Sequence, residues 1–271
     1  MKRKMKPLVE MPFLDHLEEL RWRILWSLLA LAVGTVIGFV LVHYLGVLEL
    51  LIRPIQPLLE EGEGLKYFSP VTPFFITLKL GIIVGFLLAF PVVVYHVWSF
   101  FSPALEDHEK KAIVPALYLG LVLFCAGVAL AYFGVLPLSL VFLSGFQQDY
   151  LDQAIEVGLY LGFVTRLLIA FGVVFELPVV VMVLTALGII TPDFLRTKRR
   201  HAIVGITVLA TLVTPGDPGS TLLMMAPMMV LYEVSILLSR VIYRKQRARD
   251  AERERELAGT TEPAPGSVEA R

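Results

Sequence analysis

Six long apolar runs constrain this chain more than any other feature of its sequence. They cover residues 24–45, 74–101, 112–136, 159–187, 202–213 and 221–238. A bilayer core about 30 Å thick is crossed by a helix of about 20 apolar residues. None of the runs alternates polar and apolar residues with a period of two, which excludes the strands of a membrane barrel. We therefore predict an all-α polytopic membrane protein with six transmembrane helices.

The fourth and fifth runs depart from the usual span length in opposite directions. The fourth run would form a helix of about 43 Å, so it must tilt, kink or project, and Pro178 supplies a kink site. The fifth run would cover only about 18 Å. Thr191, followed by Pro192, has the form of a helix N-cap that precedes this run. A short fifth span predicts a thinned bilayer or screening by neighbouring helices.

The positive charges are distributed very unevenly among the connections. Lys and Arg number 24, as do Asp and Glu, and the zero net charge gives no support to a nucleic-acid partner. Of the 24 cations, 20 lie in the N-terminal segment, the second and fourth loops and the C-terminal tail. Arg53 and Lys66 alone lie on the opposite side. The positive-inside rule therefore predicts that both termini are cytoplasmic.

The composition and motifs argue for one membrane domain without covalent chemistry. We expect residues 1–240 to form a single six-span domain, and the charged tail 241–271 to continue the last helix for some turns and then be disordered. Cys125 is the only cysteine, so no intrachain disulfide is possible. The sequence has no phosphate-binding loop, nucleophile elbow or zinc motif. We predict no catalytic residue, no metal ligand and no cofactor, and therefore no enzyme.

A charged side chain inside a span is costly and requires a reason. Lys79 and Arg166 lie close enough to the outer ends of their spans to reach the interface. Glu176 lies near the middle of the fourth run, directly before Leu177 and Pro178. Because so short a side chain cannot reach the interface, Glu176 must be protonated, paired or facing a wet cavity. We therefore predict an intramembrane polar site at Glu176.

Two acidic clusters lie on the predicted cytoplasmic face. Glu18 and Glu19 precede the first run, and Glu106, Asp107 and Glu109 lie in the second loop. Acidic residues early in a helix complement its dipole, which is a sufficient structural explanation for the loop cluster. The alternative is a receptor for a basic ligand. The residues by themselves leave both explanations open.

Five motifs in order make the family recognisable. The chain resembles TatC, the multispanning subunit of the twin-arginine protein translocase, from about Pro12 to Arg240. The motifs are His16-Leu-x-Glu19-Leu-Arg21-x-Arg23, Pro91-x-x-x-Tyr95-x-x-Trp98-x-Phe100-x-x-Pro103-Ala104-Leu105-x-x-x-Glu109, Ala131-Tyr132-Phe133 with Pro137, Ala170-Phe171-Gly172-x-x-Phe175-Glu176-x-Pro178, and Thr214-Pro215-x-Asp217. The resemblance implies a concave, glove-like bundle with short fifth and sixth spans in the inner (cytoplasmic) membrane.

The resemblance implies a function in recognition and export. TatC proteins bind the twin-arginine signal peptides of folded cargo proteins, and export is driven by the proton-motive force. Carried over, Glu19 and Glu109 form the twin-arginine site, and the physics agrees because an arginine fork pairs bidentately with a carboxylate. Glu18, Glu106 or Asp107 can share that role. Further positions matching the family's signal-recognition residues are Arg21, Arg23, Phe100 and Pro103.

The resemblance also implies partners. The family's fourth-span glutamate, which corresponds to Glu176, faces the concave side, and the last two spans dock the single-span subunits TatA and TatB. Here Thr211, Thr214 and Thr221 can contribute polar contacts to that edge. The expected surroundings are membrane lipid and further copies of the chain within a complex.

Two rivals come from other classes of protein. A secondary transporter of a small solute would explain Glu176 and the kinked helices, but it normally carries internal repeats and paired discontinuous spans, which the sequence lacks. An intramembrane enzyme would need a nucleophile–base pair, and none occurs at suitable spacing. The transporter is the stronger of the two rivals.

Overall fold

The structure is a computed structural model that describes residues 13–59, 64–101, 107–145 and 154–260. Within these ranges the regular structure is helical, and one isolated parallel bridge joins Lys66 to Glu156. The all-α prediction is therefore confirmed for the described residues. The elements in order are α1 (Phe13–Tyr44), α2 (Val47–Ile52), η1 (Gln56–Leu58), α3 (Thr72–Phe101), α4 (Asp107–Leu130), η3 (Ala131–Val135), α5 (Leu136–Ser144), α6 (Val157–Val174), α7 (Leu177–Ala186), α8 (Pro192–Thr197), α9 (Arg199–Val213) and α10 (Pro218–Thr260).

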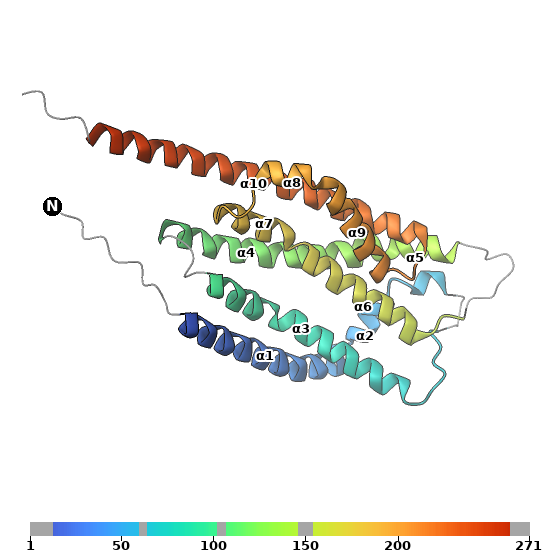
Figure 1. The fold of residues 1–271 in the computed structure, drawn as a ribbon. Coiled ribbons are helices and arrows are strands. Elements are labelled where there is room, and N and C mark those ends of the chain that lie inside the picture. Colours follow the sequence, from blue (N-terminus) through green and yellow to red (C-terminus); the bar gives the residue numbers. More distant parts are fainter. Residues whose placement is uncertain (1–12, 60–63, 102–106, 146–153, 261–271) are drawn as a thin grey trace, which may run out of the picture.

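Five helical segments of the described chain are long and apolar enough to cross a membrane. They are Leu17–Tyr44, Thr72–Phe100, Leu117–Ser144, Val157–Ala186 and Pro218–Arg249. In Figure 1 they lie side by side as an elongated bundle. The fifth predicted run lies in α9, which has only 15 residues. Five of the six predicted spans thus have the expected length and composition, and the short one stays a prediction.

The third span is longer than the apolar run 112–136 predicted. The run stops before Pro137, which lacks the N–H that would continue α-helical pairing. In the structure a five-residue π-helix, η3, precedes α5 and shifts the hydrogen-bond register ahead of this proline. The helix therefore passes Pro137 without ending and extends to Ser144.

Of the three possibilities for the fourth span (tilt, kink or projection), the structure shows a break at the Pro178 kink site. α6 ends at Val174, and α7 begins at Leu177 with Pro178 in its first turn. Glu176 is the N-cap residue of α7, and its backbone oxygen accepts bonds from Val179 and Val180, both at 3.0 Å. The break thus places Glu176 at a bend between two half-span helices.

The segment before the fifth run differs from the prediction of one helix starting at Thr191. Thr191 does cap a helix, since its side chain accepts a bond from the backbone N–H of Phe194 at 3.2 Å. That helix, α8, ends at Thr197, and a new helix, α9, begins after Lys198. The N-cap and Pro192 therefore mark a separate short helix ahead of the fifth run.

The last helix begins earlier and ends later than its apolar run. Asp217 caps its start by accepting a bond from the backbone N–H of Ser220 at 2.6 Å. Beyond the run, Gln246 Nε2 donates to the Ala186 oxygen at 2.6 Å and so joins α10 to the end of α7. The charged tail accordingly begins as a helix that reaches Thr260.

Glycines set the distance between α1 and α3. Gly34 and Gly38 of α1 face Gly81 and Gly85 of α3, and each element carries two glycines four residues apart. A Cβ at Gly85 would lie 2.5 Å from both Cα and N of Thr35. Small residues with this spacing let membrane helices approach until their backbones touch. The rest of α1 exposes large apolar side chains, as a helix facing lipid does.

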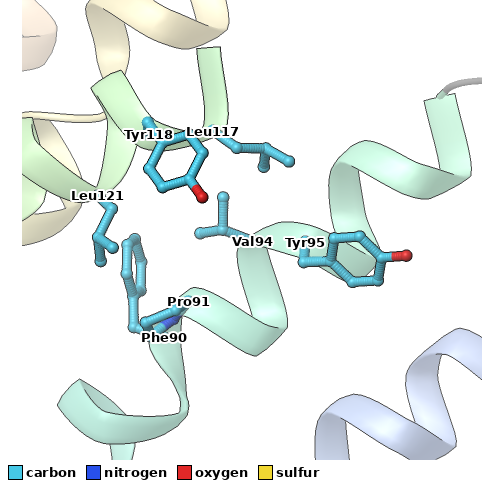
Figure 2. A pocket seen from close by; sticks show the side chains of 7 residues that line it. All are labelled: Phe90, Pro91, Val94, Tyr95, Leu117, Tyr118 and Leu121. Atoms are coloured by element: carbon cyan, nitrogen blue, oxygen red, sulfur yellow. The ribbon is translucent and has the colours of Figure 1, made fainter. Parts of the chain in front are cut away.

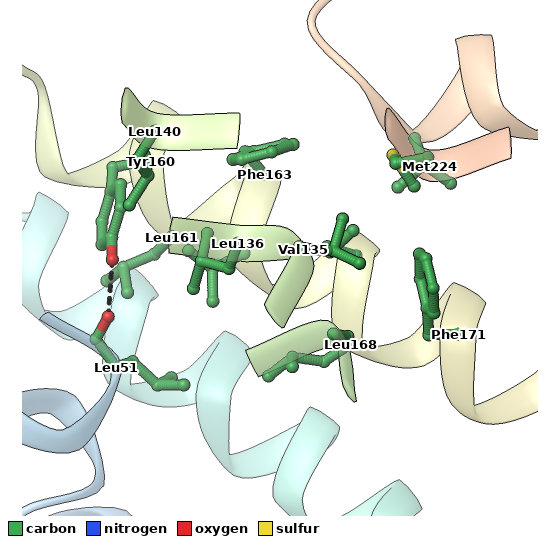
Figure 3. Close-up of a cluster of buried hydrophobic side chains, with 14 of the residues drawn as sticks. Leu51, Val135, Leu136, Leu140, Tyr160, Leu161, Phe163, Leu168, Phe171 and Met224 are labelled. Carbon is green, nitrogen blue, oxygen red and sulfur yellow. Dashed lines mark hydrogen bonds between the residues drawn. The ribbon is translucent and has the colours of Figure 1, made fainter. Parts of the chain in front are cut away.

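The core surrounds α6, which is the most buried of the long helices. Figure 3 shows its side chains meeting those of η3, α5 and α10. The Tyr160 hydroxyl donates to the Leu51 oxygen at 2.7 Å and so joins α6 to α2. Phe171 is fully buried in the same cluster. This packing fixes the bent α6–α7 segment against its neighbours.

Candidate functional site

Glu19 lies at the beginning of α1, one helical turn before Arg23. Arg23 donates from Nε to Glu19 Oε1 at 3.0 Å, and its Nη2 pairs with the same oxygen. Both side chains are about three-quarters covered, with 20% and 26% of their surface exposed for Arg23 and Glu19 respectively. The charge-assisted bonds from Arg23 hold the Glu19 carboxylate in place.

An apolar cavity lies between α1 and α3 directly beyond this ion pair. We call it the first cavity; its volume is about 350 Å³. Arg23 and Phe100, two predicted site residues, both line it. Its remaining lining side chains are mostly aliphatic or aromatic: Leu20, Ile24, Ser27, Leu28, Leu31, Phe86, Val93, His96 and Val97. Going along α1 from Glu19 inward, the site therefore changes from acidic to apolar.

The other predicted recognition residues are placed differently. Arg21 is exposed and lies two residues from Glu19, on another face of α1. Glu109 lies in the first turn of α4, which begins at Asp107, but its side chain is outside the described residues. Pro103 and Glu106 lie outside the described residues altogether. Figure 1 shows the first turns of α1, the end of α3 and the start of α4 at the same end of the bundle.

A second cavity of about 290 Å³ lies between α3 and α4, on another face of α3. Figure 2 shows Phe90 and Val94 of α3 opposite Tyr118 and Leu121 of α4. Pro91, Tyr95 and Leu117 complete the lining. An apolar cavity of this size can receive the side chains of an apolar peptide segment.

Glu176 lies close to the second cavity. Val94 and Leu117, which line that cavity, also pack against the buried cluster of Trp98 and Val179, and Val179 lies one turn after Glu176. The Glu176 carboxylate faces Gly120 of α4, where a Cβ would lie 2.7 Å from Oε2. Its Oε1 is buried without a hydrogen-bond partner among the described residues. A buried oxygen without a partner is costly, and a proton, a water or a ligand group at this carboxylate would lower that cost.

The three predicted partner-binding threonines divide into two kinds. The Thr214 and Thr221 hydroxyls lie 3.0 Å apart and join α9 to α10, and Thr221 also donates to the Asp217 oxygen at 2.7 Å. Thr211 is exposed, although its hydroxyl donates to the Thr207 oxygen at 2.8 Å. Two of the three thus hold the α9–α10 hairpin together, and one presents a polar group at its surface.

Two residues that the sequence reasoning passed over belong to these sites. His96 lines the first cavity, and its Nδ1 is buried without a partner among the described residues. Gly120 leaves the space that the Glu176 carboxylate occupies. A search for uncharged polar residues inside the apolar runs would have found His96. Nothing in the sequence singles out Gly120, because its role depends on a neighbour 56 positions away.

Within the described part of the chain, no group of His, Cys, Asp and Glu side chains is arranged to hold a metal ion. The described sites consist of one ion pair, two apolar cavities and one intramembrane carboxylate. Such groups can bind a ligand that carries positive charge next to an apolar segment.

Comparison with known proteins gives a consistent result. The profile of the family described as "Sec-independent protein translocase protein (TatC)" matches residues 15–227. The protein of that name from Aquifex aeolicus is 41% identical over 239 residues, which are 88% of this chain and 98% of the relative. The one from Escherichia coli K12 is 37% identical over 88% of this chain and 92% of its own length. A solved structure described as the twin arginine translocase receptor TatC superposes with a TM-score of 0.76 at 40% identity, covering 84% and 99% of the two chains.

Proposed function

The chain belongs to the TatC family of Sec-independent protein translocase proteins, and from this membership we propose that it is a receptor for twin-arginine signal peptides. In this function it is the membrane-embedded core subunit of a translocase that exports folded proteins, driven by the proton-motive force. The rival explanation, a transporter of small solutes, gains no support, because the relatives reported above are named as protein translocase components.

The observation that carries the proposal is the order of groups along α1. The acidic Glu19 comes first and the apolar first cavity follows, with Arg23 and Phe100 at their junction. A peptide with an arginine pair ahead of an apolar segment has the complementary order. We propose that the arginines bind Glu19 and Glu109 and that the apolar segment lies against α1 and α3. Arg21 and Pro103 are further candidates for contact with the peptide in this proposal.

The chemistry of Glu19 supports recognition of arginine over lysine. A guanidinium presents a rigid fork of donors that pairs with both oxygens of a carboxylate, whereas an ammonium acts as a point charge. Arg23 already holds the Glu19 carboxylate in one orientation. A preoriented acceptor loses less freedom on binding, which favours the ligand with matching geometry.

The proposed topology has six spans with both termini in the cytoplasm of the cell's inner membrane. The beginning of α1, the end of α3, the start of α4 and the end of α10 share one end of the bundle (Figure 1), which supports this arrangement. Most of the 24 Lys and Arg residues lie in the segments at that end. α9 is only about 22 Å long, which is short for a transmembrane helix. It directly precedes α10 along the chain, and in the proposed topology these two helices are the fifth and sixth spans.

We also propose that TatA- and TatB-type single-span subunits dock along α9 and α10, within a complex that contains further copies of the chain. Thr211 is exposed on α9, and exposed aliphatic side chains accompany it on both helices: Ile203, Val204, Val208, Leu212, Leu222 and Val230. A membrane helix that packs on this edge would bring its own small or polar residues to Thr211.

The function is tested by binding a signal peptide to the purified protein in detergent. We expect an Arg-Arg peptide to bind at least about tenfold more tightly than the same peptide with Lys-Lys, because loss of bidentate pairing costs on the order of 1.5 kcal/mol. Fluorescence anisotropy of a labelled peptide at physiological salt measures both affinities and screens nonspecific attraction. Equal affinities would show that the acidic residues merely attract positive charge, and would refute the receptor function.

A separate test concerns Glu176. Glu176→Gln keeps the size of the side chain but removes the ionisable group. We expect export to slow by about tenfold, which corresponds to the loss of one interaction of about 1.4 kcal/mol. Peptide binding should be unchanged. The assay is export of a folded cargo into energised membrane vesicles. Glu233→Gln is the matched control, since Glu233 forms a half-exposed ion pair with Arg199 at 2.6 Å. Full export by Glu176→Gln would show that no ionisable group is needed there.

A further inference from the structure

Two positive charges converge at the end of the bundle opposite Glu19. Lys79 lies on α3 and Arg166 on α6, and both side chains are exposed. Lys79 Nζ and Arg166 Nη2 each lie 3.5 Å from the position that a Cβ would have at Gly162. The distance between the two nitrogens is therefore no larger than the sum of these two distances. Gly162, which has no side chain, leaves the space between them open.

The pair has no acidic partner within the described residues. The salt bridges there are Glu19–Arg23, Glu49–Arg53 and Glu233–Arg199, and neither Lys79 nor Arg166 takes part in one. Arg166 Nε donates to the Gly162 oxygen at 3.1 Å, which holds the guanidinium beside α6. Two like charges held this close repel each other, and an anion between them would remove the repulsion and accept hydrogen bonds from both.

An apolar cavity adjoins Lys79, the first of the two charges. It has a volume of about 230 Å³ and lies between α3 and α6, with Lys79 at its wall. Phe75, Ile76, Leu80 and Leu161 are the large apolar side chains in its lining. A ligand that occupies both the space between the two charges and the apolar cavity must join an anionic group to an apolar chain.

The depth of the pair agrees with the level of lipid phosphates. Lys79 is seven residues from the start of α3, or about 10 Å, and Arg166 is nine from the start of α6, or about 14 Å. Both spans are longer than the hydrocarbon core, so long basic side chains at these positions reach the headgroup region. Exposed Tyr67, Phe68 and Phe74 near the start of α3 supply the aromatic residues typical of a membrane interface.

From this geometry we infer that Lys79 and Arg166 bind the phosphate of an anionic phospholipid, with one acyl chain in the cavity between α3 and α6. Basic positions between membrane helices bind anionic headgroups by the same physics. The bound lipid fills the space between the two helices, and it lies on the face away from the proposed signal-peptide site. The inference does not depend on the proposed receptor function.

The test is lipid retention by the full-length protein in detergent, measured by native mass spectrometry. The variant Lys79→Gln/Arg166→Gln is expected to retain one phosphatidylglycerol fewer than the unmodified protein, with an affinity for that lipid about tenfold lower. Arg53→Gln is the matched control, because it removes a cation that is already paired with Glu49 at 3.3 Å. It should retain the lipid, and phosphatidylcholine should bind equally to all three proteins.

Two further arms identify the ligand and its position. Gly162→Leu keeps both charges but fills the space between them, so it should lose the same lipid. Excess inorganic phosphate should leave the lipid bound. Equal phosphatidylglycerol retention by the double variant and the Arg53→Gln control would overturn the site. If Gly162→Leu retained phosphatidylglycerol, the lipid phosphate would not bind beside Gly162, and that placement would be overturned. Displacement of the lipid by inorganic phosphate would show a simple anion site in place of a lipid site.

Discussion

Glu19→Ala is expected to weaken binding of an Arg-Arg signal peptide by about 10- to 100-fold, because a hydrogen bond to a charged group contributes about 1.5–3 kcal/mol. Glu19 is mostly covered, and Arg23 fixes its orientation, so its carboxylate is a preorganised acceptor. The same substitution should reduce the preference for Arg-Arg over Lys-Lys, since one of the two proposed bidentate acceptors is removed. Peptide titrations against the purified variant measure both effects.

Glu18→Ala provides the matched control for this prediction. Glu18 is the neighbouring residue with the same charge, but it is exposed on another face of α1. Its removal lowers the general negative potential as much as Glu19→Ala does, and salt screens that contribution. We expect a change of less than about threefold in affinity, as for other exposed charges. If the two variants weaken binding equally, long-range charge, and not pairing at Glu19, attracts the peptide.

Glu109→Ala tests the second carboxylate in the same titration. Its position in the first turn of α4 puts it at the same end of the bundle as Glu19. If both carboxylates bind the arginine pair, the double variant should lose less than the sum of the two single effects, because they share one ligand. Strict additivity would indicate two independent contacts.

Gly85→Leu is expected to lower the free energy of unfolding by about 3 kcal/mol or more, the upper part of the range for overpacking. A Cβ at Gly85 meets Cα and N of Thr35 at 2.5 Å and the Gly34 carbonyl carbon at 2.7 Å, all of them backbone atoms. Backbone cannot rotate aside as a flexible side chain can, so α1 and α3 must separate. Unfolding in mixed micelles, followed by circular dichroism, measures the change.

Gly205→Leu separates packing from the intrinsic effect of the substitution. Gly205 lies in α9 with nothing within 4 Å of the position its Cβ would have. Leucine favours helix over glycine by about 0.8 kcal/mol, so the control should be unchanged or slightly stabilised. A loss of stability in Gly205→Leu equal to that in Gly85→Leu would refute the close-packing explanation.

Gly85→Leu should also weaken signal-peptide binding. The first cavity is formed by α1 and α3 together, and the ion pair of Glu19 with Arg23 lies at its border. Separation of the two helices would widen the cavity and move Phe100 away from Arg23. Stability and peptide binding are therefore coupled through one helix contact.

Several features of the fold were predictable because they depend on neighbouring residues in the sequence. Five of the six spans predicted from the apolar runs are helices of spanning length, Pro178 supplied the kink site at the break beside Glu176, and Thr191 predicted a helix cap. Two boundaries were not predictable in the same way. The π-helix before Pro137 keeps the third span helical, and the break at Lys198 separates α8 from α9. A proline usually ends a helix, and no proline or glycine marks the break at Lys198, so neither boundary follows from the rules for helix ends.

The candidate sites also contain some features that follow from the local sequence and others that depend on how the helices pack. Glu19 and Arg23 lie four residues apart on one helix, so their ion pair follows from helical geometry alone. Glycines four residues apart, at Gly34 and Gly38 and again at Gly81 and Gly85, signal close helix packing. That signal does not state which helix packs on which. The structure pairs α1 with α3, and this pairing creates the first cavity.

The sequence by itself determined that this chain is helical and embedded in a membrane, and that its charges are sorted between two ends, because hydropathy, helix breaking and charge are properties of short segments. Only the tertiary structure decided that Glu176 faces Gly120, that Thr214 meets Thr221 across a hairpin, and that Lys79 and Arg166 converge at Gly162. Those contacts join different helices, and their geometry depends on how closely and at what register the helices pack. Side-chain volume and backbone approach set that register in three dimensions, so no single segment of the sequence contains it.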